Sequence, residues 1–328
     1  MKKLLFLSLI ALGTSCKNGA LVNSTKNVEP TQYMKTITAE DLKKHLYIIA
    51  ADSMQGRETG SAGQKKAGRY LIGEYQKNQV SFPKGASDFY QAVPAAFLNK
   101  KRNNNLPDSE NIWAFIEGTE KPEEVIVISA HYDHVGIENG EIYNGADDDG
   151  SGTSALLEIA QAFQMAKKEG NGPKRSILFL HVTGEEHGLL GSRYYSENPL
   201  FPLANTVADV NIDMIGRRDE LHATTNNYVY IIGANRLSAE LDHISAAMNQ
   251  KYIGLDLDYR FNDPKDPNRF YERSDHYNFA KHGIPSVFFF NGVHADYHKK
   301  TDEADKIEYD ALEKRTQLAF VVAWELAN

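Results

Sequence analysis

The sequence has almost no cysteine, and beyond its N-terminus it has no long apolar run. Its 328 residues include one cysteine, Cys16, so no intrachain disulfide can form and core burial alone must stabilise the fold. The apolar content of 41% is ordinary for a globular protein and allows a sizeable core. No second apolar span suited to a transmembrane helix follows residue 12, and no repeat of fixed period is present.

Basic residues are neither in excess nor clustered. The chain has 36 Lys and Arg against 44 Asp and Glu, for a formal net charge of −8. Nucleic-acid-binding proteins normally carry a basic surface, so we expect no nucleic-acid partner. The charge balance suits a protein that acts on small or peptide-like substrates.

Sequence signatures of serine catalysis are missing as well. No G-x-S-x-G sequence is present, which argues against the nucleophile turn of α/β-hydrolases. Ser274, Asp275 and His276 are consecutive, and three consecutive residues cannot converge as nucleophile, base and orienting acid.

The N-terminus has the features of an export signal. Lys2 and Lys3 precede an apolar run from Leu4 to Leu12, and small residues then lead to Cys16. Such a segment is typical of a secretory signal and is too short to span a bilayer. Residues 1–16 resemble a bacterial lipoprotein signal, in which the cysteine becomes the lipidated first residue. The alternative is an ordinary cleaved signal with an incidental cysteine.

We therefore expect an exported protein, a lipoprotein held to a membrane through Cys16, in the periplasm or at the cell surface. Residues 17–37 are polar with little periodicity, and they are predicted to form a flexible tether. Residues 38–328 are predicted to form one catalytic domain, because no linker divides them. The sequence carries no indication of an oligomeric state.

The folded part alternates between helix-like and strand-like segments. Thr38 is a suitable start for a helix, and the Gly-rich loop 55–63 leads into a second helix. Residues 153–167 have an amphipathic helix pattern. Apolar runs predict buried strands over residues 125–130, 176–182, 207–213, 228–232 and 286–290. The alternation predicts a single α/β domain with a central mixed, mostly parallel sheet and helices on both faces.

Acidic residues and histidines directly follow several predicted strands. The clusters are 131–134 (HYDH), 144–152 (NGADDDGSG), 183–188 (TGEEHG), 211–216 (NIDMIG) and 296–298 (DYH). Ligands of open α/β sheets bind just beyond the carboxyl ends of strands, so this placement predicts one shared site.

The residue types indicate metal chemistry. Carboxylates and imidazoles without thiolates suit Zn²⁺ in a site open to water. Two ions about 3.5–4 Å apart need a bridging carboxylate, and together they polarise a carbonyl and activate water. A further carboxylate must remain off the metals to carry a proton to the leaving amine.

In these clusters the sequence resembles the co-catalytic zinc aminopeptidases of bacteria, which are distantly related to glutamate carboxypeptidase and glutaminyl cyclase. The motifs occur in the same order from Leu42 to the C-terminus. The resemblance implies a zinc-dependent exopeptidase fold with two Zn²⁺ ions per chain, although cobalt or manganese suits the same ligands. It implies His131 and Asp213 as ligands of one ion, Glu186 and His298 as ligands of the other, and Asp148 as the bridge.

The same resemblance implies the remaining roles. Glu185 becomes the general base, Asp133 the partner that orients His131, and Tyr297 a hydrogen-bond donor to the developing oxyanion. The peptide bond from Asp148 to Asp149 is expected in the rare cis form, which needs enforcement by its surroundings. Residues 273–276 are implied to support the site, and the insert 256–271 is expected to be a loop that selects substrates.

Simpler explanations compete with these assignments. Three aspartates before a helix are usually an N-cap with solvated charges. Glu185, Glu186 and Asp213, however, end apolar strands, where unpaired carboxylates are costly. His294 stands near His298, and the family pattern favours His298 as ligand. The sequence identifies no partner for six other histidines, which are His134, His181, His187, His222, His243 and His282.

These observations predict an aminopeptidase that acts on peptides with a free N-terminus. A carboxypeptidase, a dipeptidase and a one-zinc glutaminyl cyclase are alternatives on the same scaffold. A pocket for a substrate carboxylate would use Arg260, Arg269 or Arg273, whereas the complete ligand set argues against the cyclase. A non-catalytic binding module would be expected to have lost ligands, and none of the five is missing.

Overall fold

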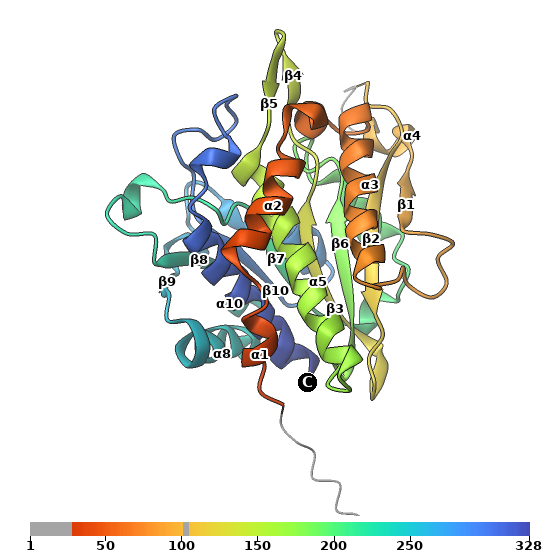
Figure 1. The fold of residues 1–328 in the computed structure, drawn as a ribbon, viewed down its shortest axis with the longest axis vertical. Coiled ribbons are helices and arrows are strands. Elements are labelled where there is room, and N and C mark those ends of the chain that lie inside the picture. The colour runs from red at the N-terminus through yellow and green to blue at the C-terminus, as the bar shows by residue number, and fades with distance from the viewer. Residues whose placement is uncertain (1–27, 101–104) are drawn as a thin grey trace, which may run out of the picture.

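The computed structural model describes residues 28–100 and 105–328 and shows one eight-stranded sheet between layers of helices (Figure 1). The strand order is β1-β2-β6-β3-β7-β10-β8-β9. The strands are β1 (Tyr90–Val93), β2 (Ser109–Ile116), β3 (Lys121–His131), β6 (Arg175–Val182), β7 (Thr206–Ile212), β8 (Tyr228–Ile232), β9 (Asp256–Asp258) and β10 (Ser286–Phe290). A separate hairpin of β4 (Gly136–Glu138) and β5 (Glu141–Tyr143) rises above one edge of the sheet (Figure 1).

The centre of the sheet is parallel. β3 pairs in parallel with β6 and β7, and β7 pairs in parallel with β10. The flanks include the antiparallel pairs β1–β2, β2–β6 and β8–β10, and the short β9 adds a parallel pair with β8. The predicted mixed, mostly parallel sheet is thus confirmed. Because the four central strands share one direction, their carboxyl ends meet at the same edge.

Helices cover both faces of the sheet, as predicted. On one face, Leu156 and Phe163 of α5 join Phe320 and Trp324 of α10 in the main hydrophobic core. The other face is covered by α6 and α9, whose Tyr195 and Phe279 belong to a second apolar cluster. The helices are α1 (Thr31–Met34), α2 (Ala39–Ile49), α3 (Ala62–Lys77), α4 (Ala95–Leu98), α5 (Gly152–Lys168), α6 (Leu190–Glu197), α7 (Ala234–Leu237), α8 (Ala239–Met248), α9 (His276–Ala280) and α10 (Tyr309–Ala327).

The predicted elements are present with small differences in their bounds. The Thr38 hydroxyl accepts a hydrogen bond from the Asp41 amide and so caps α2, as expected for a helix start. The insert 256–271 is a loop only in part, because its first residues form β9 and extend the sheet. The backbone of β9 forms hydrogen bonds with the edge of β8, and the polar sequence of the insert does not predict this pairing.

The folded domain begins earlier than predicted. Tyr33, Met34 and Ile37 are buried in the main core, and the Tyr33 ring stacks on Trp324 of α10. The prediction of a flexible tether is therefore wrong for residues 31–37. The segment is mostly polar, so its few apolar residues do not predict a buried element. Their burial depends on contact with α10, which is distant in the sequence.

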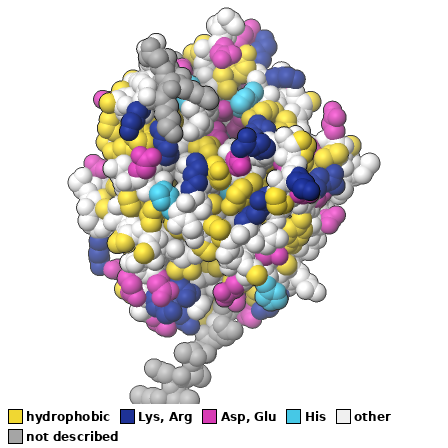
Figure 2. Space-filling model, turned by 180° about the vertical axis from the view of Figure 1, so that it is seen from behind, with side chains coloured by type: hydrophobic (Ala, Val, Ile, Leu, Met, Phe, Trp, Pro, Cys, Tyr) yellow, Lys and Arg dark blue, Asp and Glu magenta, His cyan; other side chains and the backbone are white. Residues whose placement is uncertain are grey.

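The predicted export signal and Cys16 lie outside the described residues. Within residues 28–100 and 105–328, no helix has the length and apolarity needed to cross a bilayer. On the rear face, Lys and Arg side chains are interspersed with acidic and apolar ones (Figure 2).

Candidate active site

The central strands bring distant sequence clusters together at their common carboxyl edge. β3 ends at His131, the segment after β6 contains Glu185 and Glu186, and Asp213 directly follows β7. Asp148 lies in a π-type turn that leads into the N-terminus of α5. The structure thus places all five predicted metal ligands together, since His298 faces Asp148 across the site.

The carboxylate of Asp148 lies between two groups of side chains. Its Oδ1 is 3.1 Å from His131 Nε2, and its Oδ2 is 3.1 Å from His298 Nε2. Burial alone would raise the pKa of Asp148, but His131 and His298 hold that pKa well below its usual value. One carboxylate therefore faces both groups at once.

The first ligand group consists of His131, Asp213 and Asp148 Oδ1. His131 Nε2 lies 3.6 Å from Asp213 Oδ1, while the other oxygen of Asp213 accepts a hydrogen bond of 2.7 Å from the Ser274 hydroxyl. His131 Nδ1 contacts the main-chain oxygen of Asp133 at 3.0 Å. These outer contacts leave His131 Nε2 and Asp213 Oδ1 facing the site.

The second ligand group consists of Glu186, His298 and Asp148 Oδ2. His298 Nε2 lies 3.0 Å from Glu186 Oε2. The pKa of Glu186 falls to about 2, because the imidazoles of His134 and His298 outweigh the opposing effects of burial and Asp148. His134 Nδ1 is 2.8 Å from Glu186 Oε1, so the structure brings into the site a histidine that the sequence analysis left without a partner.

The donor atoms fit a zinc ion. Among the described residues, the buried atoms His131 Nε2, Asp148 Oδ2 and Glu186 Oε1 have no hydrogen-bond partner, and leaving such groups unpaired is costly. Zinc bonds of about 2.0–2.1 Å in a tetrahedral site separate the ligand atoms by roughly 3.3 Å. The separations of 3.0–3.6 Å within the two groups are close to this value.

Glu185 lies beside the ligands without joining either group. Its Oε2 is 4.0 Å from His131 Nε2. Burial, together with the negative charge of Glu186, raises the pKa of Glu185 well above its usual value, against the opposing effect of His131. A carboxylate with a raised pKa accepts a proton more readily, which suits a general base.

The Asp133 carboxylate holds the segment that carries Glu185. Its Oδ1 accepts the Glu185 amide at 3.2 Å, and its Oδ2 accepts the Thr59 hydroxyl at 2.8 Å. Its distance of 3.8 Å from His131 Nδ1 is too long for a hydrogen bond. The geometry therefore differs from the expected orienting contact, because the main-chain oxygen of Asp133 takes that place.

The three aspartates Asp147, Asp148 and Asp149 are buried, which argues against the alternative of an N-cap with solvated charges. Asp302 accepts hydrogen bonds from the amides of Asp147 and Asp148, and Asp149 accepts them from two further amides. His294 Nε2 lies 3.1 Å from Asp147 Oδ2, so His294 supports the turn while His298 faces the ligands. The peptide bond from Asp148 to Asp149 is cis, as predicted.

Arg57 connects the two loops that carry His131 and Asp148 through hydrogen bonds to their main-chain oxygens. Its side chain is fully buried and donates to the main-chain oxygens of Tyr132, Ile49, Asn144 and Gly145 at 2.7–3.0 Å. Tyr132 directly follows His131, whereas Asn144 and Gly145 directly precede the turn that contains Asp148. The guanidinium thus holds the ends of two ligand loops at a fixed separation.

We expect Arg57→Met to lower the free energy of unfolding by about 3 kcal/mol or more, since several buried carbonyls lose charged donors. Denaturant unfolding followed by fluorescence measures this change. Arg69→Met, on the exposed side of α3, is the matched control and should shift the midpoint little. Equal midpoints for the two variants would contradict the proposed support.

Ser274, Asp275 and His276 point in different directions. The Ser274 hydroxyl donates to Asp213, whereas Asp275 accepts a short hydrogen bond from Ser192. The His276 ring stacks on Phe288. These residues form no triad and support the walls of the site, as expected.

A pocket lined by both charged and apolar side chains adjoins the predicted ligands. Its lining includes the charged or polar residues Asp148, Glu185, Asp213, Arg273 and Tyr297. The remaining lining residues are Met214, Phe270, Phe288, Phe290 and Val293. The Tyr297 ring stacks on the His298 imidazole at 3.9 Å, which places the tyrosine beside a ligand.

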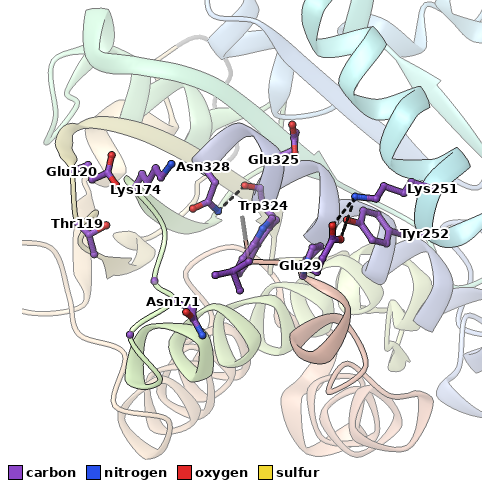
Figure 3. A pocket seen from close by; sticks show the side chains of 14 residues that line it. Glu29, Thr119, Glu120, Asn171, Lys174, Lys251, Tyr252, Trp324, Glu325 and Asn328 are labelled. Atoms are coloured by element: carbon purple, nitrogen blue, oxygen red, sulfur yellow. Dashed lines mark hydrogen bonds and ion pairs between the residues drawn. The ribbon is translucent and has the colours of Figure 1, made fainter. Parts of the chain in front are cut away.

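Another pocket lies at the opposite edge of the sheet, where β3 and β6 begin (Figure 3). Glu29, Lys251 and Tyr252 interact on one side of it, and Glu120 and Lys174 lie on the other (Figure 3). Two groups of side chains that could hold a metal ion are found in the described part of the chain, and both lie at the carboxyl edge instead; they are His131, Asp148 and Asp213, and His134, Asp148 and Glu186.

Comparison with known proteins identifies the family. Residues 111–323 match peptidase family M28, and this stretch contains all five predicted ligands. The chain belongs to peptidase family M28. It is therefore a zinc-dependent metallopeptidase, as predicted.

Relatives of this M28 peptidase include aminopeptidases. It is 29% identical to a probable leucine aminopeptidase of Trichophyton verrucosum (strain HKI 0517), over 93% of this chain and 78% of that protein. A probable leucine aminopeptidase of Arthroderma benhamiae (strain ATCC MYA-4681 / CBS 112371) is 29% identical over 66% of this chain, but the match spans only 57% of that protein.

Solved structures show the same fold. The zinc aminopeptidase BSAP from Bacillus subtilis superposes with a TM-score of 0.66 at 18% identity, covering 88% of this chain and 95% of that one. The glutaminyl cyclase of Porphyromonas gingivalis superposes with a TM-score of 0.65 at 18% identity, covering 88% and 98%. Since both an aminopeptidase and a cyclase share the fold, the reaction must be argued from the site.

Proposed function

We propose that this M28 peptidase is an aminopeptidase that uses two zinc ions and releases N-terminal residues from peptides. The observation that carries the proposal is the position of Asp148, whose two oxygens face separate ligand groups. A carboxylate in this position is what a pair of ions requires as a bridge. The first ligand group would hold one ion and the second group the other.

The protein groups around the ions have distinct tasks. When bound, the ions supply Lewis acidity that polarises the scissile carbonyl and makes water more acidic. Glu185 takes the proton of the attacking water and passes it to the departing amine. The Tyr297 hydroxyl donates to the oxyanion that develops on the carbonyl oxygen. Asp133 keeps Glu185 in place through the amide contact.

The pocket supports a substrate with an apolar first residue and a free amine. Phe270, Phe288 and Phe290 supply apolar walls for a side chain. Glu185 lines the same pocket and belongs to neither ligand group, so its carboxylate can accept a hydrogen bond from the free α-amine. Phe270 comes from the insert 256–271, which we propose selects the substrate side chain.

We expect the zinc-loaded protein to cleave a leucyl peptide with a free N-terminus and to cleave the N-acetylated peptide far less. Acetylation removes the charged amine, so kcat/KM should fall by about 10- to 100-fold or more. Release of leucine measured by chromatography reports the difference. The protein treated with a chelator is the control and should cleave neither peptide.

Other outcomes of the same assay would favour the alternatives. Equal cleavage of the two peptides would contradict recognition of the amine. If amidation of the peptide's C-terminus abolished cleavage instead, a carboxypeptidase or dipeptidase would be favoured, with Arg273 of the pocket lining as the carboxylate ligand. Conversion of an N-terminal glutamine to a cyclic product would identify a glutaminyl cyclase.

We further propose that the enzyme is exported and held to a membrane by a lipid on Cys16, in the periplasm or at the cell surface. The basic tip and apolar run of residues 1–16 support this location. Incorporation of labelled palmitate into the wild-type protein, and its loss in Cys16→Ser, would support lipidation.

A further inference from the structure

His134 is a buried histidine at the second ligand group. Its side chain is 0% exposed, and Nδ1 lies 2.8 Å from Glu186 Oε1 and 3.8 Å from Asp148 Oδ2. The ring meets that of His298 edge-on, with 5.8 Å between centroids. His134 thus approaches the space between Asp148 and Glu186 from a side that His298 does not occupy.

The imidazole has no other partner among the described residues. Neither ring nitrogen makes a hydrogen bond of acceptable geometry, and Glu186 Oε1 also lacks one. A buried imidazole without a partner is costly. The two unpaired atoms face the same space, and their separation of 2.8 Å needs only a small increase to reach the roughly 3.3 Å between two ligands of a tetrahedral zinc ion.

Gly145 leaves room for this ring. A Cβ at Gly145 would lie 2.4 Å from His134 Cδ2, and the residue has a φ of +54°. A side chain at Gly145 would therefore displace the ring as well as strain the backbone. The absence of a side chain at Gly145 thus leaves the space that the His134 ring occupies.

We propose that His134 is a further protein ligand of the second ion, in addition to its three predicted ligands. The inference rests on the two-ion site proposed above. His134, Asp148 and Glu186 each offer one ligand atom, and these atoms lie within 4.8 Å of one another. His298 reaches the same two carboxylates. The second ion would then have two imidazoles, while the first has one.

This arrangement makes the two ions unequal. Four protein ligands complete a tetrahedral zinc site and close it to water, whereas three leave a position open. The first group, with His131, Asp213 and Asp148, would therefore leave a position for water, and Glu185 lies next to this group. With four protein ligands, the second group would hold its ion more tightly than the first group.

The test is zinc binding by the metal-free protein, measured by calorimetry against a competing chelator. The wild-type protein should bind two ions with two affinities. His134→Ala should weaken one of the two by about 10- to 100-fold or more and leave the other unchanged. The visible absorption of the Co²⁺-loaded protein should change as well, because the ion loses a ligand. His181→Gln, at a buried histidine outside the site, is the matched control.

A second variant separates a ligand from a positioning group. Asn in place of His134 retains an N–H near the position of Nδ1, so His134→Asn should restore affinity if the histidine only donates to Glu186. We expect no such rescue, and full rescue would overturn the proposal. Two unchanged affinities in His134→Ala would also overturn it while leaving the two-ion site intact. A single ion bound by the wild-type protein would instead overturn the two-ion proposal itself.

Discussion

Glu185→Gln is expected to bind zinc as the wild-type protein does and to lose most of its turnover. Glutamine has nearly the same shape but cannot accept the proton of the attacking water, so kcat should fall by about 10²–10⁴-fold. Zinc binding should persist because Glu185 belongs to neither ligand group and its Oε2 is 4.0 Å from the nearest ligand nitrogen. Turnover of the leucyl peptide and zinc content measured on one preparation check both points.

Two matched variants make this prediction specific. Glu197→Gln, on the exposed side of α6, should change neither property. Glu186→Gln should lose zinc as well as turnover, since Glu186 faces His298 at 3.0 Å. If Glu185→Gln kept substantial activity, another group would have to be the base.

Asp148→Ala is expected to abolish the paired metal site. The variant removes one ligand from each group at once, so the protein should bind fewer than two ions and lose activity by at least about 10³-fold. Zinc should also cease to stabilise the fold, because a ligand raises the midpoint of thermal unfolding only when it binds the native state. Calorimetric zinc titration and thermal unfolding with and without zinc measure the two effects.

The control is Asp310→Ala, at an exposed aspartate in the first turn of α10. It should retain two ions and the zinc-dependent rise in the unfolding midpoint. Undiminished binding of two zinc ions by Asp148→Ala would rule out this residue as the bridge. A loss of both ions, rather than one, would show that the two sites bind cooperatively through the shared carboxylate.

Some of the fold is readable from local pattern and some is not. The central strands β3, β6, β7 and β10 are predicted because they are buried on both faces and hence continuously apolar. β2 is not predicted, since it begins with Ser109, Glu110 and Asn111. These polar side chains are tolerated in a strand because Ser109 and Asn111 bond to Gln64 and to the Gly191 carbonyl.

Helix α10 is a further element that the sequence pattern does not reveal. It is buried over most of its length, from Leu312 to Ala327, so its apolar residues do not form a single stripe. Its contacts with α2, α5 and α8 explain this burial. The same helix covers Tyr33, which is why the start of the folded domain is misplaced in the prediction.

The site shows the same division. His131, Asp148, Glu186, Asp213 and His298 are predicted because each stands in a motif, and their order along the chain suffices to name the family. The residues that hold the ligands in place have no such motif. Arg57 donates hydrogen bonds to main-chain oxygens, which every residue has, so no particular sequence marks its partners. His294 contacts Asp147, which is distant in the sequence.

The sequence by itself determined the fold class, the family's zinc chemistry and the five candidate ligands, because strand-end motifs and residue types are local properties. Only the tertiary structure decided which oxygen of Asp148 faces which ligand group, and that the main chain rather than the carboxylate of Asp133 contacts His131. It also brought His134 to Glu186. These are relations between side chains on separate segments, and their distances exist only once the strands have aligned at a common edge.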